Sequence, residues 1–199
     1  CTDVLVGCKL YKIKQLDTKL MYNVLLEKKS PSRNKMERLY NKEFCIENKK
    51  PTWNKIYEQK IINMKSAKLK EFNFKMLHNI VPCGYVISKW NSNVQANCNK
   101  CGMVETTKHM LYECVYISTI WDKISDIIKI VIQWKHIVTG FYNFDGAGVM
   151  VYNCIISIIV YAIFKEEMHG RYTGKHITEF DIIQKIRSNI LFYKSICNI

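Results

Sequence analysis

The stretch CNKCGMVETTKHMLYEC at residues 98–114 contains the most informative pattern in this chain of 199 residues. It spaces Cys98, Cys101, His109 and Cys114 as C-x2-C-x7-H-x4-C. Three thiolates and one imidazole make a closed tetrahedral ligand set, which is the form that structural zinc takes. Gly102 directly after the cysteine pair permits the tight turn that points both sulfurs at one ion. We therefore predict one structural Zn²⁺ with no open position for a catalytic water.

The whole pattern is far more specific than the cysteine pair. A chain with this many cysteines contains about 0.4 accidental C-x2-C pairs, and an H-x4-C within ten residues lowers the expectation to about 0.005. The alternative is a set of buried free thiols beside a helical histidine. A redox C-x-x-C would need a thioredoxin-like βαβ setting, which the sequence does not suggest.

The spacing between His109 and Cys114 limits the backbone conformations that let both side chains reach one ion. Thr106 or Thr107 is a suitable helix N-cap and would place His109 in the first turn. On a straight α-helix, residues five apart point about 140° away from each other. We therefore expect the helix to be short, or to unwind before Cys114, or His109 to reach around it.

The remaining cysteines and histidines do not form a second pattern. Nine cysteines, an odd number, at irregular spacing and without a visible signal peptide argue against a disulfide framework. They favour a reduced, intracellular chain in the nucleus or cytoplasm. Cys83 is a possible spare ligand, and His78 is expected in the core or at its boundary. No catalytic residues are predicted, since no paired carboxylates, Ser/His/Asp spacing or phosphate loop stands out.

The positive charge is concentrated in the first half of the chain. The formal net charge is +13, and residues 1–90 hold 19 Lys/Arg against 8 Asp/Glu. Residues 91–199 hold 11 against 9. A basic half is expected of a surface that binds phosphates, and equally of a solvated, lysine-rich helical surface.

Hydrophobic periodicity predicts a mainly α fold. Apolar residues recur at spacings of three and four in several segments, and loops are expected at 140–148, with Asp145-Gly146 as the turn, and at 170–174. The expected architecture is a multi-helix domain with an inserted Cys-Cys-His-Cys zinc knuckle that contains at most a small β-hairpin. The predicted helical segments are 1–25, 34–47, 53–64, 67–80, 117–134 and 178–196.

Residues 146–164 carry no charge and approach the length of a membrane span. Asn153 and Ser157 interrupt the apolar run. A helix that is apolar on every side is also found at the centre of a helical bundle. We favour the bundle centre and expect no membrane.

Residues 69–82, LKEFNFKMLHNIVP, resemble a sequence motif of LINE-type (non-LTR) retrotransposon polyproteins. In that family this motif is followed by a Lys-Trp element, here Lys89-Trp90, and then by the Cys-Cys-His-Cys region at the C-terminal end of the reverse transcriptase. The run from Glu105 to Cys114, followed by Trp121, is similar to the family pattern, and so is Trp53 with Ile56-Tyr57 upstream. The resemblance is close over residues 53–134 and weaker outside.

The resemblance implies the zinc-binding domain of a reverse transcriptase, an appendage that handles nucleic acid during target-primed reverse transcription. It implies a division into a basic helical segment (1–50), the zinc-binding domain (51–134) and a helical tail (135–199). Polymerases of that family hold magnesium with a Tyr-x-Asp-Asp-type motif, which these residues lack, as they lack the endonuclease. We therefore expect no enzyme in this chain, which begins with Cys1 rather than Met and looks like a fragment of a longer protein.

The expected function is phosphate binding by a zinc-stabilised module, with RNA or DNA as the partner. Exposed aromatic residues such as Tyr85 or Tyr112 would stack on unpaired bases. The alternative is a helical docking piece whose zinc is purely structural and whose partner is the missing polymerase portion. No small-molecule substrate is expected. The lysines expected to contact phosphates are Lys65, Lys68, Lys70, Lys75, Lys89, Lys100 and Lys108.

Overall fold

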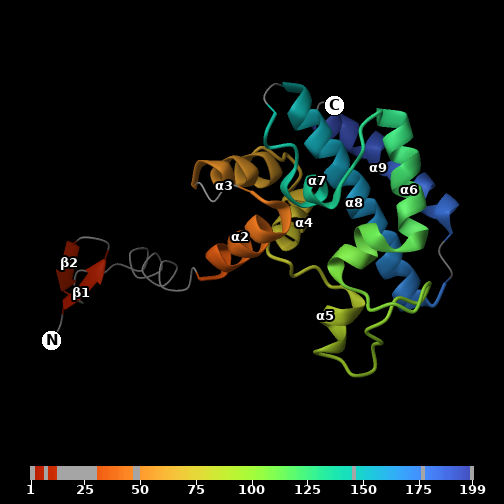
Figure 1. Cartoon of the computed structure of the whole chain (residues 1–199), viewed down its shortest axis with the longest axis horizontal. Helices are drawn as coiled ribbons and strands as arrows, with labels where there is room; N and C mark the ends of the chain where they lie inside the picture. The colour runs from red at the N-terminus through yellow and green to blue at the C-terminus, as the bar shows by residue number, and fades with distance from the viewer. Residues whose placement is uncertain are drawn as a thin grey trace. The chain divides into compact units, whose positions relative to one another are not determined.

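The computed structural model describes residues 3–6, 9–12, 31–46, 50–144, 147–175 and 178–197. The chain divides into two compact units, Cys1–Ile46 and Glu47–Ile199. Helices dominate the described residues, as Figure 1 shows. The predicted mainly α fold class is confirmed.

The first unit contains a β-hairpin and one helix. Strands β1 (Asp3–Val6) and β2 (Lys9–Lys12) pair antiparallel, with Val4 opposite Tyr11. The helical segment predicted over 1–25 is therefore wrong for residues 3–6 and 9–12, where β-branched and aromatic residues favour a strand. Residues 13–25 lie outside the described part. Helix α2 (Pro31–Phe44) starts at a proline, which suits the first helical position because its missing N–H needs no partner there.

The second unit begins with a helix that changes its hydrogen-bonding pattern. Helix α3 (Lys50–Tyr57) continues as the π-helix η2 (Glu58–Ile62), and α4 (Ala67–Leu77) follows after a short break. Ser66 caps α4, since its Oγ accepts from the Leu69 N–H at 3.5 Å. A short helix, α5 (Gly84–Ser88), leads to the cysteine cluster. The predicted helices in 53–64 and 67–80 are present, with the second one ending at Leu77.

The remaining helices are η3 (His109–Glu113), α6 (Val115–Ile128), α7 (Trp134–Thr139), α8 (Ala147–Thr173) and α9 (Glu179–Cys197). Two predictions about them are wrong. The segment 117–134 is not one helix, because Lys129 adopts a left-handed conformation (φ 55°) that ends α6. The expected loop at 170–174 is helical up to Thr173, and only Gly174 (φ 67°) turns away. The Asp145-Gly146 turn lies outside the described residues.

Helix α8 is the central element of the second unit. It contacts α9, α4, α7, η2 and η3, and Figure 1 shows it running between them. By length and composition its segment Gly148–Thr173 could cross a membrane, and half of the apolar window is buried inside the protein. This packing fits the bundle-centre interpretation. The buried side chains of α8 are Asn153, Cys154, Ile156, Ser157, Ile158, Ile159, Val160, Ala162 and Ile163.

A lysine lies in the core beside α8. Lys60 is 1% exposed, and its Nζ donates to Ser157 Oγ at 3.1 Å. Asn73 Nδ2 donates to the Lys60 carbonyl at 2.7 Å and to Ser157 Oγ at 3.2 Å. Among the described residues, no carboxylate pairs with the Lys60 ammonium. Burial therefore lowers the pKa of Lys60 from 10.5 to about 7, and the nearby Cys154 thiol opposes this only in part.

This burial makes stability depend on pH. Between pH 7 and 10.5 the unfolded chain keeps the Lys60 proton that the folded chain releases, so wild-type stability rises with pH in that window. Lys60→Met removes the charge at similar volume and is expected to raise the free energy of unfolding at pH 7. The amount by which its free energy of unfolding exceeds that of wild type is expected to shrink by on the order of 4 kcal/mol as the pH rises through this window. Urea unfolding of both proteins at several pH values measures this difference, and the exposed Lys68→Met is the control. Parallel pH profiles for wild type and Lys60→Met would contradict it.

Candidate metal centre

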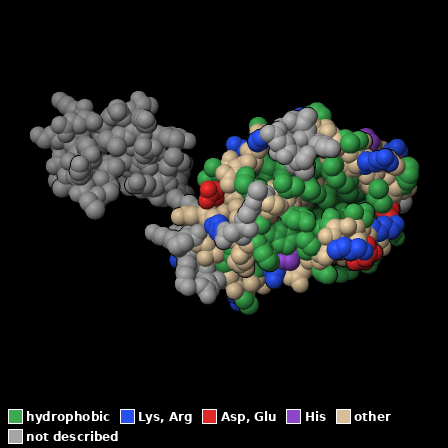
Figure 2. All heavy atoms as spheres, turned by 90° about the horizontal axis from the view of Figure 1, so that it is seen from above, with side chains coloured by type: hydrophobic (Ala, Val, Ile, Leu, Met, Phe, Trp, Pro, Cys, Tyr) green, Lys and Arg blue, Asp and Glu red, His purple; other side chains and the backbone are tan. Residues whose placement is uncertain are grey.

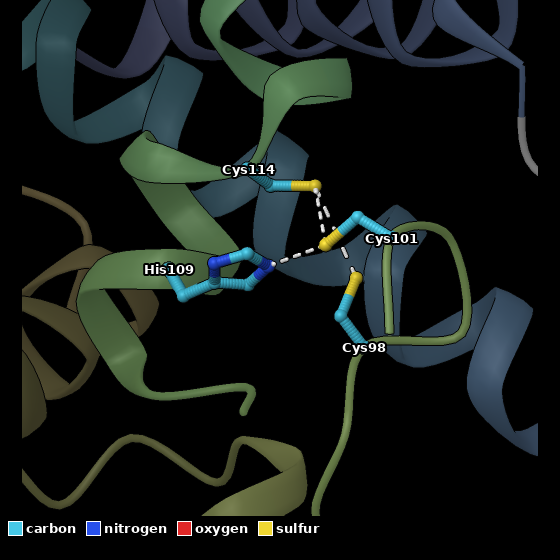
Figure 3. Close-up of side chains that lie close together, drawn as sticks. All are labelled: Cys98, Cys101, His109 and Cys114. Atoms are coloured by element: carbon cyan, nitrogen blue, oxygen red, sulfur yellow. Dashed lines mark hydrogen bonds between the residues drawn. The ribbon is translucent and has the colours of Figure 1, made fainter. Parts of the chain in front are cut away.

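The four predicted ligands come together at one point (Figure 3). Their ligand atoms all lie within 4.8 Å of one another. Cys114 Sγ is 3.9 Å from Cys98 Sγ and 4.0 Å from Cys101 Sγ, and Cys101 Sγ is 3.1 Å from His109 Nε2. Among the described residues no other group of three or more Cys, His, Asp or Glu side chains is close enough to hold a metal ion.

These separations match the edges of a zinc tetrahedron. Zn–S bonds of about 2.3 Å place two tetrahedral sulfur ligands about 3.8 Å apart, and the shorter Zn–N bond brings nitrogen and sulfur closer. Both observed sulfur–sulfur distances are close to that value, and the nitrogen–sulfur distance is the shorter one. The chain therefore has a Cys₃His site that could hold one zinc ion.

The first two ligands lie on a tight turn. The Gly102 N–H donates to the Cys98 carbonyl at 2.9 Å, and Gly102 has φ 76°, which a glycine adopts without strain. The Cys98 N–H then donates to the Met103 carbonyl at 2.7 Å. An isolated antiparallel bridge between Asn97 and Val104 completes the turn. The β-structure of the knuckle is thus limited to one bridge.

The other two ligands are brought together by a π-helix. Thr106 Oγ1 accepts from the His109 N–H at 3.1 Å and begins this helical segment, as the sequence predicted. In η3 the Cys114 N–H donates to the His109 carbonyl at 3.0 Å, so the hydrogen bond spans five residues rather than the four of an α-helix. The wider turn brings residues 109 and 114 closer to the same side of the segment. The chain also leaves the helix at Cys114, with ψ 132°.

The thiols interact strongly before any cation is considered. The Cys114 thiol donates to the Cys98 sulfur, which lowers the pKa of Cys98 well below its usual range. The same bond, together with burial, raises the pKa of Cys114. Deprotonating all three thiols in this space therefore requires a compensating positive charge, and a divalent ion supplies it.

The site is supported by the core behind it. Cys98, His109 and Cys114 are 5%, 8% and 1% exposed, so three of the four ligands are closed off from solvent. Leu111, between the second pair of ligands, is fully buried, and its carbonyl accepts from Trp121 Nε1 at 2.8 Å. This closed arrangement suits a structural ion.

Two nearly buried ion pairs join the knuckle to α8, and we call them the α8 clasp. Arg171 Nη2 lies 2.5 Å from Glu105 Oε1, with side-chain exposures of 9% and 5%. Lys100 Nζ lies 2.5 Å from Glu167 Oε1, with exposures of 12% and 11%. Burial raises the pKa of Glu167, and the Lys100 ammonium opposes that effect.

The clasp also holds the start of α5. Glu105 Oε1 accepts from the Gly84 N–H at 2.7 Å, and Arg171 Nη1 donates to the Gln95 carbonyl at 3.2 Å. A Cβ on Gly84 would lie 2.9 Å from Arg171 Nη2 and 3.0 Å from the Gln95 carbonyl oxygen. No side chain therefore fits there without displacing the clasp. Neither Glu167 nor Arg171 stands out in the sequence, because charges one turn apart on a helix are typical of an ordinary solvated face.

The seven predicted phosphate-binding lysines are in different surroundings. Lys100 is in the clasp, Lys75 pairs with Glu71 at 2.6 Å, and Lys108 pairs with Glu113 at 2.9 Å. The other four have no acidic partner in the described part of the chain. Of these, Lys65, Lys68 and Lys89 are exposed and Lys70 is half-buried.

The other residues singled out in the sequence, as a spare ligand, as stacking aromatics or as a core histidine, lie in different surroundings. Cys83 is buried and accepts from Thr107 Oγ1 at 3.9 Å, outside the ligand cluster. Tyr112 donates to the Ile132 carbonyl at 3.2 Å and packs beside Trp121, so it belongs to the core boundary. Tyr85 is 43% exposed. His78 is half-buried against Phe74, at 4.2 Å between ring centroids, in the boundary position predicted for it.

Comparison with known proteins agrees with the geometry. A family model described as zinc-binding in reverse transcriptase matches residues 18–121, which is more than half of the chain and includes all four ligands. Searches of curated proteins and of solved structures gave no match. The Cys₃His cluster and the family match lead to the same conclusion: this chain belongs to the family of zinc-binding domains in reverse transcriptases.

Proposed function

We propose that this zinc-binding domain binds nucleic acid for a reverse transcriptase of the LINE type, during target-primed reverse transcription. Zinc would hold the knuckle in shape, and lysines at α4 and at the end of α5 would contact phosphates. Copying the nucleic acid would be the task of the polymerase portion, which is the second proposed partner. The proposal places the protein in the nucleus or cytoplasm.

The observation that carries the proposal is uncompensated positive charge at α4 and at the end of α5. No Asp or Glu occurs between Glu71 and Glu105 in the sequence. Lys65, Lys68, Lys70 and Lys89 have no acidic partner among the described residues, so their charges are available to an anion. Phosphate contacts of this kind give most of the sequence-independent affinity of nucleic-acid-binding proteins.

A salt titration tests the proposal. Each lysine–phosphate contact with a single strand adds about 0.7 to the slope of log affinity against log salt concentration. Replacing Lys65, Lys68 and Lys70 together by Gln is expected to reduce that slope by about 2 and to weaken binding at low salt. Fluorescence anisotropy of labelled oligonucleotides with the zinc-loaded full chain measures both quantities.

The matched control neutralises three other exposed lysines, Lys129, Lys135 and Lys165, which lowers the net charge equally. The control is expected to keep most of the slope. Equal slopes for the two triple variants would mean that only net charge matters, which contradicts the assignment of these lysines.

A second candidate function is docking onto the polymerase portion, and an apolar groove favours it. The groove has a volume of about 470 Å³ and is lined by Phe141, Phe144, Val149 and Tyr152, with Ile130 and Gly148. Figure 2 shows that the face seen from above, where α8 begins in Figure 1, is broadly hydrophobic. A zinc-loaded chain without measurable affinity for RNA or DNA would favour docking as the function.

A further inference from the structure

One tryptophan lies on the surface just after α5. Trp90 is 76% exposed, whereas Trp53, Trp121 and Trp134 are 2%, 3% and 7% exposed. Of the three apolar residues Val86, Ile87 and Trp90, only Ile87 is buried. An exposed tryptophan contributes nothing to the core, and tryptophan is enriched at binding surfaces because its ring combines a large apolar face with a polar N–H.

Tyr85 on α5 and Lys89, which directly follows α5, precede Trp90 in the chain. Tyr85 is 43% exposed, and the Lys89 ammonium lies 4.0 Å from the centre of its ring. This cation–π contact holds a positive charge beside an exposed aromatic face. We call Tyr85, Lys89 and Trp90 the α5 platform.

Hydrogen bonds of the backbone hold the α5 platform in place. The Tyr85 N–H donates to the Glu105 carbonyl at 3.1 Å, and the Gly84 N–H donates to the Glu105 carboxylate at 2.7 Å. The Trp90 N–H donates to the Ile87 carbonyl at 2.9 Å. The base of the platform is thus tied to the knuckle and, through Glu105 and Arg171, to α8. Binding there would need little ordering of the backbone, which favours affinity.

The chemistry of the surrounding surface narrows the choice of partner. The chain from α5 to the first zinc ligand contains no acidic residue. The polar side chains after Trp90 are amides and one hydroxyl, which can donate to phosphates and pair with base edges. An acidic polymer with exposed flat rings complements a basic surface with exposed aromatic rings. The exposed polar residues of this segment are Asn91, Ser92, Asn93, Gln95 and Asn97.

We propose that the α5 platform binds unpaired nucleotides of a single strand, with Trp90 and Tyr85 stacking on bases and Lys89 contacting a phosphate. This inference rests on the proposed nucleic-acid binding and names the kind of strand that is bound. A duplex keeps its bases stacked on one another, so it offers the platform phosphates but no base faces.

Tryptophan fluorescence tests stacking directly, since Trp90 is the exposed one of the four tryptophans. The zinc-loaded full chain is titrated with twelve-nucleotide oligo(dT), with oligo(U) of the same length and with a duplex. Both single strands are expected to quench part of the wild-type emission, and the stronger of the two identifies DNA or RNA as the preferred strand. Quenching is expected to disappear in Trp90→Phe, which keeps the other three tryptophans.

Affinity measurements separate stacking from charge. Trp90→Ala is expected to weaken single-strand binding about 10-fold without changing the salt slope, because one stacked base is lost and no phosphate contact. Trp90→Phe is expected to keep most of the affinity, since a phenyl ring still stacks. Lys89→Gln is expected to lower the salt slope by about 0.7. Ile127→Ala, which truncates an equally exposed apolar residue on α6, is the matched control and is expected to bind as wild type does.

Two failures can be told apart. Salt-dependent single-strand binding with no quenching and an unchanged Trp90→Ala affinity would overturn the platform and leave the proposed function standing. No binding of any oligonucleotide by the wild type would overturn both. Equal loss of duplex and single-strand affinity in Trp90→Ala would also contradict stacking.

Discussion

Cys114→Ser is expected to lose the zinc ion and most of the stability of residues 98–114. The serine hydroxyl cannot replace the thiolate as a zinc ligand at neutral pH, because it stays protonated. Zinc bound to small sites of this kind contributes roughly 10–16 kcal/mol to the local fold. The turn at Cys98 and Cys101 has only one β-bridge and its own hydrogen bonds to hold it otherwise.

Native mass spectrometry of the reduced protein measures the zinc content, and thermal unfolding with and without a chelator measures the stabilisation. One zinc per wild-type chain is expected, with a large fall in melting temperature on chelation. The chelator is expected to have little effect on the melting temperature of Cys114→Ser, which has no ion to lose. Zinc affinity is expected to fall as pH falls, because protons compete for the thiolates and for His109.

Cys83→Ala is the matched control, since Cys83 is as buried as Cys114 and lies beside the knuckle without being a ligand. It is expected to keep its zinc and to lose only the modest stability of a small cavity. A folded, reduced wild type that contains no zinc and ignores the chelator would refute the ligand assignment.

The ligand set was predictable from the sequence because metal geometry constrains residue types and spacing very tightly. Three cysteines and one histidine close together in the sequence are enough to define the site. Gly102 predicts the tight turn because glycine adopts it without strain, and Thr106 predicts the helix start because threonine is a favoured N-cap. The helical starts at Ser66 and Thr178 follow the same local rules, and Thr178 Oγ1 accepts from the Asp181 N–H at 3.2 Å. Local patterns of this kind need no knowledge of the rest of the chain.

Features that depend on distant contacts were not predictable. Choosing a π-turn over an α-turn at His109 shifts a hydrogen bond by one residue, and sequence periodicity does not register that shift. Lys60 reads as a surface residue until Asn73 and Ser157 surround it. Gly170 reads as a loop residue, yet α8 continues through it because Arg171 is held at the knuckle.

Breaking the α8 clasp at Arg171 is expected to have the second largest effect. Arg171→Met keeps much of the side-chain volume but leaves the Glu105 carboxylate buried with the Gly84 N–H and no cation. Removing one partner of a buried ion pair typically costs 3–5 kcal/mol, because the other charge stays buried and uncompensated. Chemical denaturation of the zinc-loaded chain is expected to show a loss of about that size.

The matched control is Lys123→Met, which breaks an exposed pair between α6 and α9. Lys123 and Glu179 have side-chain exposures of 58% and 35%, and exposed pairs contribute at most about 1 kcal/mol. Similar losses for Arg171→Met and Lys123→Met would mean that the clasp contributes no more than an ordinary surface pair.

A second substitution separates the buried charge from the lost packing. Glu105→Gln in the Arg171→Met background removes the uncompensated carboxylate and keeps an oxygen that can accept from the Gly84 N–H. This double variant is expected to recover most of the lost stability, whereas Glu105→Gln alone is expected to destabilise the chain by stranding the arginine. Arg171 lies well beyond residue 121, where the family match ends. Recovery would therefore mean that the charge balance around this zinc knuckle is completed by α8, and that the folded unit extends past the matched region into that helix.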